Sequence, residues 1–161
     1  MKTYIGTKMI QAEPMTREEF SEAKKSALNQ PGTLGHPLDP MEEGYMVAYS
    51  DGYLSWSPKD VFDKSYLEVT VNPELKTKAP SISQQMVDDF IDDVKVITLD
   101  GKTTVVRVLL KNGFTCVEAS SCVSPENYDE AMGAKICMDR IKNQIWKLLG
   151  FLLQTAVGGV K

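Results

Sequence analysis

The sequence predicts an α+β protein of two small subdomains, each a short antiparallel sheet packed with one or two helices. Strand-like segments are joined by Asp-Gly and Asn-Gly pairs, which are typical of antiparallel hairpins. Helical segments with capping residues lie beside each group of strands. The 161 residues suit one ordinary domain or two very small ones. We expect modules at residues 1–72 and 81–155, with residues 73–80 as a linker.

The N-terminal module begins with a strand and a helix. Alternation from Thr3 to Ala12 predicts the strand, and Pro14 is expected to end it. Thr16 and Glu19 form a capping-box pattern, which predicts a short amphipathic helix. Residues 29–41 contain three prolines and two glycines, so a long irregular loop should follow.

An aromatic hairpin is the next predicted feature. Residues 44–49 and 53–56 are rich in aromatic side chains and flank Asp51-Gly52, a pair that tolerates the positive φ of a primed turn. Ser57 should then cap a short helix that runs to about Lys64. Residues 66–71 are expected to return as a strand.

The C-terminal module should open with an acidic helix. Ser81 and Gln84 form a second capping-box pattern before an apolar helical face that ends near Ile91. The opposite face of this helix is predicted to carry four aspartates: Asp88, Asp89, Asp92 and Asp93. Like charges one turn apart cost a helix about 0.2–0.5 kcal/mol, so this face is either solvated or functional.

A meander and a long helix complete the second module. Residues 95–99, 104–110 and 114–118 are strand-like and are joined at Asp100-Gly101 and Asn112-Gly113. The final helix should begin at Ser124-Pro125. Its buried stripe is predicted to contain Tyr128, Met132, Ile136, Ile141, Ile145, Leu148, Leu149 and Leu152.

Composition narrows the classes of partner. A net charge of −4 gives no cationic footprint for a phosphate backbone, so nucleic acid is not an expected partner. We expect neither a membrane span nor a signal peptide, and therefore place the protein in the cytosol. The three cysteines suit a reducing compartment and are interpreted as packing residues: Cys116, Cys122 and Cys137.

Motifs for metal, cofactor or nucleophilic chemistry are not apparent. The single histidine, His36, lies in a proline-rich segment without ligand-type spacing. A phosphate-binding loop and a dinucleotide fingerprint are both missing. We therefore predict a protein that is not an enzyme and that needs neither a metal nor a cofactor.

Recognition-type residues are densest around the aromatic hairpin. Aromatic faces stack planar rings, whereas hydroxyls, a lysine and helix amides hold anionic groups. A small nucleotide would suit this combination, although the same aromatics could form the core of a small β unit. The candidate ligand-binding residues are Tyr45, Tyr49, Tyr53, Ser55, Trp56, Ser57 and Lys59.

The C-terminal module, from Ser81 to about Leu153, resembles a phage protein family named after gene products 49 and 66 of two tailed phages. The resemblance rests on residues 110–114, 122–129, 133–136 and 145–153. It implies a phage origin, and hence the cytoplasm of a host bacterium, but no catalytic residues. The family typically has Pro-Leu-Glu-Gly-Tyr after the tryptophan, where this chain has residues 147–151 without the proline, so the helix should continue.

The N-terminal module, from Tyr4 to Val69, is loosely similar to Thoeris anti-defence sponge proteins. The similarity rests on Asp51-Gly52, residues 56–58, residues 61–62 and residues 66–69. Sponges of this kind bind cyclic nucleotide immune signals intact, in pockets formed between subunits. The resemblance implies a homo-oligomer that takes up a small nucleotide.

The leading hypothesis is therefore a phage anti-defence protein that sequesters a small, cyclic nucleotide immune signal without degrading it. One alternative is an inhibitor that binds a host enzyme through the acidic helix. A less favoured alternative is a metal-dependent nucleotide hydrolase built on the four aspartates.

Overall fold

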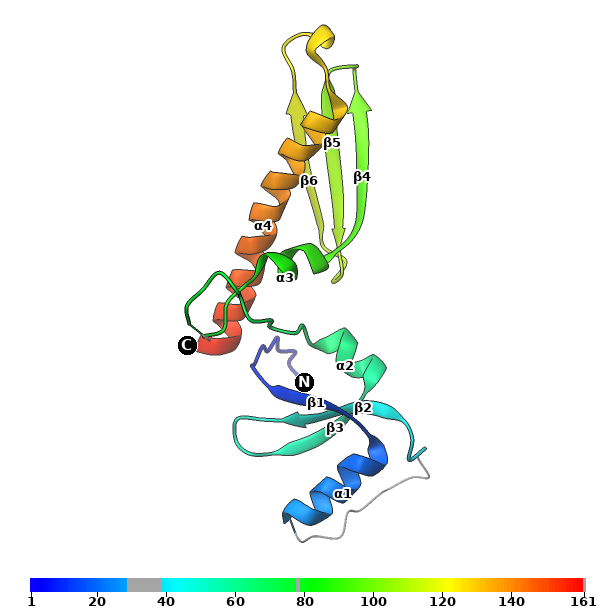
Figure 1. Ribbon diagram of the computed structural model, residues 1–161, viewed down its shortest axis with the longest axis vertical. Coiled ribbons are helices and arrows are strands. Elements are labelled where there is room, and N and C mark those ends of the chain that lie inside the picture. Colours follow the sequence, from blue (N-terminus) through cyan, green and yellow to red (C-terminus); the bar gives the residue numbers. More distant parts are fainter. Residues whose placement is uncertain (29–38, 78, 161) are drawn as a thin grey trace. The chain divides into compact units, whose positions relative to one another are not determined.

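The computed structural model describes residues 1–28, 39–77 and 79–160 (Figure 1). It divides into a first unit, Met1–Glu68, and a second unit, Val69–Lys161. Each unit contains a three-stranded antiparallel sheet packed with helices. The predicted α+β class with two small subdomains is therefore confirmed.

The first unit contains three strands in the spatial order β1-β2-β3 and two helices. Its elements are β1 (Gln11–Thr16), α1 (Arg17–Leu28), β2 (Glu43–Ala48), β3 (Leu54–Pro58) and α2 (Lys59–Ser65). In Figure 1, α1 and α2 lie on opposite faces of this sheet. The predicted loop at residues 29–41 lies mostly outside the described residues, as does His36.

The predicted N-terminal strand is displaced toward the C-terminus. The register places Thr16 opposite Glu43 and Gln11 opposite Ala48, so residues before Gln11 lie beyond the end of β2. Pro14 does not end the strand but pairs with Tyr45 within β1. Proline is tolerated there because β1 is an edge strand, whose outward side needs no hydrogen-bond donor.

The start of α1 follows the predicted capping box. The backbone N–H of Thr16 donates to Glu19 Oε2 at 2.6 Å, and the N–H of Glu19 donates to Thr16 Oγ1 at 3.3 Å. These reciprocal bonds satisfy two donors at the helix start. They lower the pKa of Glu19, first through the Thr16 backbone and then through its hydroxyl.

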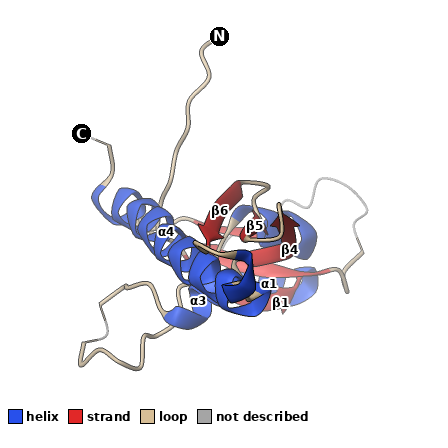
Figure 2. Ribbon diagram, turned by 90° about the horizontal axis from the view of Figure 1, so that it is seen from above, coloured by secondary structure: helices blue, strands red, loops and turns tan. Residues whose placement is uncertain are grey.

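The second unit contains one short helix, the predicted meander and one long helix. Its elements are α3 (Gln84–Asp89), β4 (Ile91–Leu99), β5 (Thr103–Leu110), β6 (Thr115–Ser121), the 3-10 turn η1 (Pro125–Asn127) and α4 (Glu130–Gly158). The strand order is β4-β5-β6. Figure 2 shows α4 as one continuous helix toward the C-terminal end. This agrees with the prediction that the helix continues past Trp146, where the family typically has a proline.

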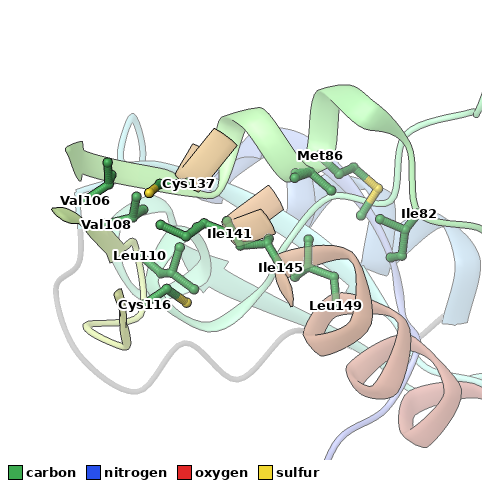
Figure 3. Packing of buried hydrophobic residues seen from close by; sticks show 11 residues of the cluster. Ile82, Met86, Val106, Val108, Leu110, Cys116, Cys137, Ile141, Ile145 and Leu149 are labelled. Atoms are coloured by element: carbon green, nitrogen blue, oxygen red, sulfur yellow. The ribbon is translucent and has the colours of Figure 1, made fainter. Parts of the chain in front are cut away.

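The core of the second unit lies between α4 and the sheet (Figure 3). Alternate β5 residues are buried, from Thr104 to Leu110, whereas their neighbours are only half-buried. On α4 the buried positions are Gly133, Cys137, Ile141, Ile145 and Leu149. The predicted stripe was wrong at Met132, Ile136, Leu148 and Leu152, which are exposed.

The predicted helices form, but three of them begin at other residues than predicted. Ser83 rather than Ser81 caps α3, and its hydroxyl accepts from the N–H of Met86 at 3.2 Å. Asp129 caps α4, whereas Ser124-Pro125 opens only the 3-10 turn. Pro58, not Ser57, is the cap of α2. The predicted strand at residues 66–71 is an irregular segment instead.

Candidate functional site

The strand register divides the predicted site between the two faces of the first sheet. Tyr45 pairs with Ser57 and Val47 pairs with Ser55, so these side chains share one face. Tyr49 and Tyr53 extend the same alternation, because the N–H of Tyr49 donates to the carbonyl of Tyr53 at 2.9 Å. We call this surface the tyrosine face; its residues are Tyr45, Tyr49, Tyr53, Ser55, Ser57 and the overlying Phe62 and Tyr66 of the α2 region.

One end of the tyrosine face is packed beneath α2. The Tyr45 and Phe62 rings stack with their centroids 4.0 Å apart, and Phe62 continues to Tyr66 at 4.7 Å. The spacing of Phe62 and Tyr66, one helical turn apart, places both rings on the same side of α2. Tyr45 is therefore engaged in packing, and the Tyr45 end of the face is closed by protein.

The hairpin end of the face remains accessible. Tyr49 and Tyr53 stack with centroids 5.8 Å apart, and Tyr53 is 60% exposed. The Lys8 ammonium lies 4.0 Å from the centre of the Tyr49 ring, a distance at which a cation is attracted to the ring face. Aromatic rings and the Lys8 ammonium thus lie close together at the hairpin end of the face.

The Tyr49 hydroxyl lies near two other hydroxyl groups, those of Ser55 and Tyr66. The Ser55 and then the Tyr66 side chains lower the pKa of Tyr49. Burial, followed by the bond to Tyr49, raises the pKa of Tyr66. The two hydroxyls therefore share a polar contact in which Tyr49 is the more readily ionised partner.

Trp56 lies on the opposite face from the tyrosines. It pairs with Met46 in the register, and its Nε1 donates to the carbonyl of Met15 at 3.3 Å. The Arg17 guanidinium covers its ring at 3.9 Å. A Cβ built on Gly44 would lie 2.4 Å from the same indole, so the ring is packed closely against the β2 backbone.

Lys59 lies between an aromatic ring and a group of carboxylates. Its ammonium lies 5.9 Å from the centre of the Tyr45 ring. It also borders an open hollow of about 350 Å³ whose other lining residues are Glu42, Glu43, Pro58, Asp60 and Asp63. Four carboxylates beside one ammonium repel phosphate rather than hold it. The α2 helix is only seven residues long, so its N-terminus supplies a weak dipole.

The predicted acidic helix face does not form. The α3 helix ends at Asp89, and Asp92 and Asp93 are the second and third residues of β4. Asp88 pairs with Lys142 at 2.8 Å, and Asp93 pairs with Arg107 at 2.6 Å. The Lys142 side chain lowers the pKa of Asp88. The four carboxylates are therefore separated between a helix and a strand.

Across the described parts of the chain, His, Cys, Asp and Glu side chains do not gather in any group of three that could hold a metal ion. Cys116 and Cys137 are buried, and burial raises the pKa of both thiols. Cys122 is half-buried, and its thiol donates to the carbonyl of Ser124 at 3.1 Å.

Within the described ranges, none of the helices has the length and apolarity that a membrane crossing requires.

Sequence reasoning missed Phe62 and Tyr66 of the tyrosine face, and it missed Lys8, which lies over the Tyr49 ring. The one-turn spacing of Phe62 and Tyr66 after the hairpin could have indicated them. Lys8 carries no local signal, because its position over Tyr49 depends on the path of the residues before β1. Whether the predicted ligand-binding residues bind a ligand stays a prediction.

Comparison with known protein families matches part of the second unit. Residues 82–157 match the model of the Phage protein (N4 Gp49/phage Sf6 gene 66) family. The match covers α3, the meander and α4 of the second unit. No curated protein and no solved structure matches the chain.

Proposed function

Because residues 82–157 belong to a phage protein family, we propose that this chain is an anti-defence protein that sequesters a small nucleotide signal of host immunity. The first unit would hold the nucleotide intact at the hairpin end of the tyrosine face. The observation that carries the proposal is the meeting of Tyr49, Tyr53, Ser55 and Lys8 at an accessible edge.

The base of the nucleotide would stack on Tyr53. Lys8 already occupies one face of the Tyr49 ring, and Tyr45 is stacked on Phe62. Tyr53 has an exposed ring directly before β3, and aromatic stacking on a base is worth about 1–3 kcal/mol. A purine would therefore extend the existing Tyr49–Tyr53 stack by one ring.

The phosphates would be held by Lys8 and Ser55. An ammonium and a hydroxyl supply charge-assisted and neutral hydrogen bonds to phosphate oxygens. Lys59 is a weaker candidate than the sequence suggested, because carboxylates surround it. Trp56 is assigned a packing role, since its ring lies on the other face beneath Arg17.

Sequestration needs fewer groups than hydrolysis. Stacking rings, a hydroxyl and a cation are enough to retain a nucleotide, whereas phosphodiester cleavage also needs an activated nucleophile and stabilisation of the leaving oxygen. The tyrosine face offers the first set of groups. We therefore favour a binding protein over an enzyme.

Calorimetric titration with cyclic dinucleotides, cyclic trinucleotides and cyclic ADP-ribose tests this assignment. Tyr53→Ala and Lys8→Ala should each weaken binding of the recognised compound at least about tenfold. Tyr4→Ala is the matched control, because Tyr4 is 82% exposed outside the tyrosine face and should leave the affinity unchanged. Equal affinity in all three variants would contradict the site, and a wild-type chain that binds none of the compounds would contradict the function.

A further inference from the structure

The outer strand of the second sheet, β4, is exposed on both of its faces. In Figure 1, β4 is the strand at the side of the sheet away from β6. The α4 helix packs over β5 and β6, and every residue from Asp92 to Leu99 is exposed. Val94 is 43% exposed on the α4 side, and Leu99 is 48% exposed on the other side. A long apolar strand with a free backbone edge is a template for pairing with another strand.

The two edges of this sheet differ. At the β6 edge, Arg140 of α4 donates to the Ala119 carbonyl, and Gln144 donates to the Glu118 side chain. The β4 edge has one irregularity, between Ile91 and Asp93, and is regular from there to Leu99. In the described part of the second unit, the Thr98 hydroxyl near the end of β4 bonds Tyr128 and Glu130, whereas the regular stretch from Val94 to Ile97 is free of such bonds to the α4 region.

We propose that β4 pairs antiparallel with β4 of a second copy of this chain, about a twofold axis at Val94. The pairing spans residues 92–96 of each strand, because the irregularity at Asp92 places Ile91 and Ile97 on opposite sides of the sheet. It leaves α4 of both copies on the same side. Residues that face each other across a strand pair have side chains on the same side of the sheet. An axis between two residues would pair sequence neighbours, whose side chains point to opposite sides, so the axis must pass through a residue.

The charges of β4 select both the partner and the register. With the axis at Val94, Asp93 of each copy lies opposite Lys95 of the other, which gives two opposite-charge pairs. An axis at Asp93 or at Lys95 would place like charges together, and in-register parallel pairing would do the same at both positions. The strand is thus self-complementary in this arrangement.

Lys95 also lacks a favourable neighbour within its own sheet. The register places it opposite Arg107, a like charge whose guanidinium pairs with Asp93 at 2.6 Å. An acidic side chain on the open side of β4 would compensate both cations. Asp93 of the second copy supplies that charge, which favours a second copy over an uncharged partner strand.

Sedimentation of the full chain and of two charge-reversal variants tests the proposal. The wild-type chain should form a dimer, twice the monomer mass of 17.9 kDa, in a concentration-dependent way. Lys95→Glu and Asp93→Lys should each weaken that dimer at least about tenfold, because each creates two like-charge pairs. Lys95→Glu places an acid beside Arg107, so its monomer should remain folded by circular dichroism.

Mixing the two variants is the decisive step. Lys95→Glu and Asp93→Lys chains are complementary to each other at both positions, so the mixture should form a heterodimer although each variant alone is monomeric. Lys147→Glu, an exposed position of α4, is the control and should sediment as wild type. A monomeric wild type, a dimer that both variants retain, or a mixture that stays monomeric would each overturn the pairing.

A covalent readout does not depend on charge. Val94→Cys should give a disulfide-linked dimer on mild oxidation, because the axis brings the two Cα atoms to about 4.5–5.5 Å. Val117→Cys, which is exposed on β6, should not crosslink. Crosslinking of Val117→Cys without crosslinking of Val94→Cys would place the interface elsewhere and overturn the proposal.

Discussion

The guanidinium of Arg17 lies 3.9 Å from the centre of the Trp56 ring. The same guanidinium donates to Glu42 Oε2 at 2.8 Å, and the indole Nε1 donates to the Met15 carbonyl. These contacts join the start of α1 to β1 and β3. Trp56 therefore holds the first unit together from the side opposite the tyrosine face.

Trp56→Ala should lower the free energy of unfolding of the first unit by about 2–3 kcal/mol, because it opens a cavity under Arg17. Hydrogen exchange of the β1–β3 amides measures this loss. Under conditions in which the unit is folded, nucleotide affinity should be retained. Lost affinity with unchanged exchange would instead make Trp56 a ligand residue.

Gly133→Ala should destabilise the second unit. A Cβ at Gly133 would lie 2.3 Å from Thr104 Oγ1, and Thr104 is fully buried. Overpacking of this kind costs about 1–3 kcal/mol. Gly150→Ala on the same helix is the matched control: its Cβ would meet nothing within 4 Å, and helix propensity predicts a gain of up to about 1 kcal/mol. Urea unfolding followed by Trp146 fluorescence should give opposite signs for the two variants.

Glu19→Gln should remove an acid-dependent part of the stability of the first unit. The Thr16 bonds hold the folded pKa of Glu19 below 4.5, so its contribution is complete above that pH and is lost as pH falls through the folded pKa. Thermal unfolding from neutral pH into this acidic range compares variant and wild type. A wild-type advantage that grows below the folded pKa of Glu19 would be the wrong sign for a capping box.

Asp88→Asn should cost the second unit less than about 1 kcal/mol, as is usual for partly exposed ion pairs. Asp88 pairs with Lys142 at 2.8 Å and thereby fastens α3 to α4. Asp89→Asn, one exposed residue later on α3, serves as the control and should be close to neutral in chemical denaturation. If Asp89→Asn were the more costly change, the ion pair would not fasten α3.

The hairpins show how far turn chemistry can be predicted from sequence. Asp100 and Gly101 both adopt positive φ, 51° and 64°, as a primed turn requires. At Asp51-Gly52 only Gly52 has positive φ, and the turn is a three-residue loop between Tyr49 and Tyr53. The Asp51 carboxylate accepts the Tyr53 N–H at 3.0 Å, which stabilises the longer loop.

The other errors arose where pairing partners lie far away in sequence. The acidic helix was extended to Asp93 because its apolar spacing continued, but β5 is long enough to pair back to Ile91 and converts these residues to strand. The division of Tyr45 and Trp56 between two sheet faces follows from the alternation along β2 and β3 once their register is known. The cation over Tyr49 could not be predicted, because Lys8 comes from an irregular segment.

The proposed function is tested most directly by mass spectrometry of released ligand. The purified chain would be incubated with the panel of cyclic nucleotides, separated from free compound, denatured and analysed. Sequestration predicts one compound recovered chemically intact at a fixed ratio to protein from the wild type and at a much lower ratio from Tyr53→Ala. Recovery of an altered compound would make the protein an enzyme, and recovery of none would contradict sequestration and favour a host protein as the target.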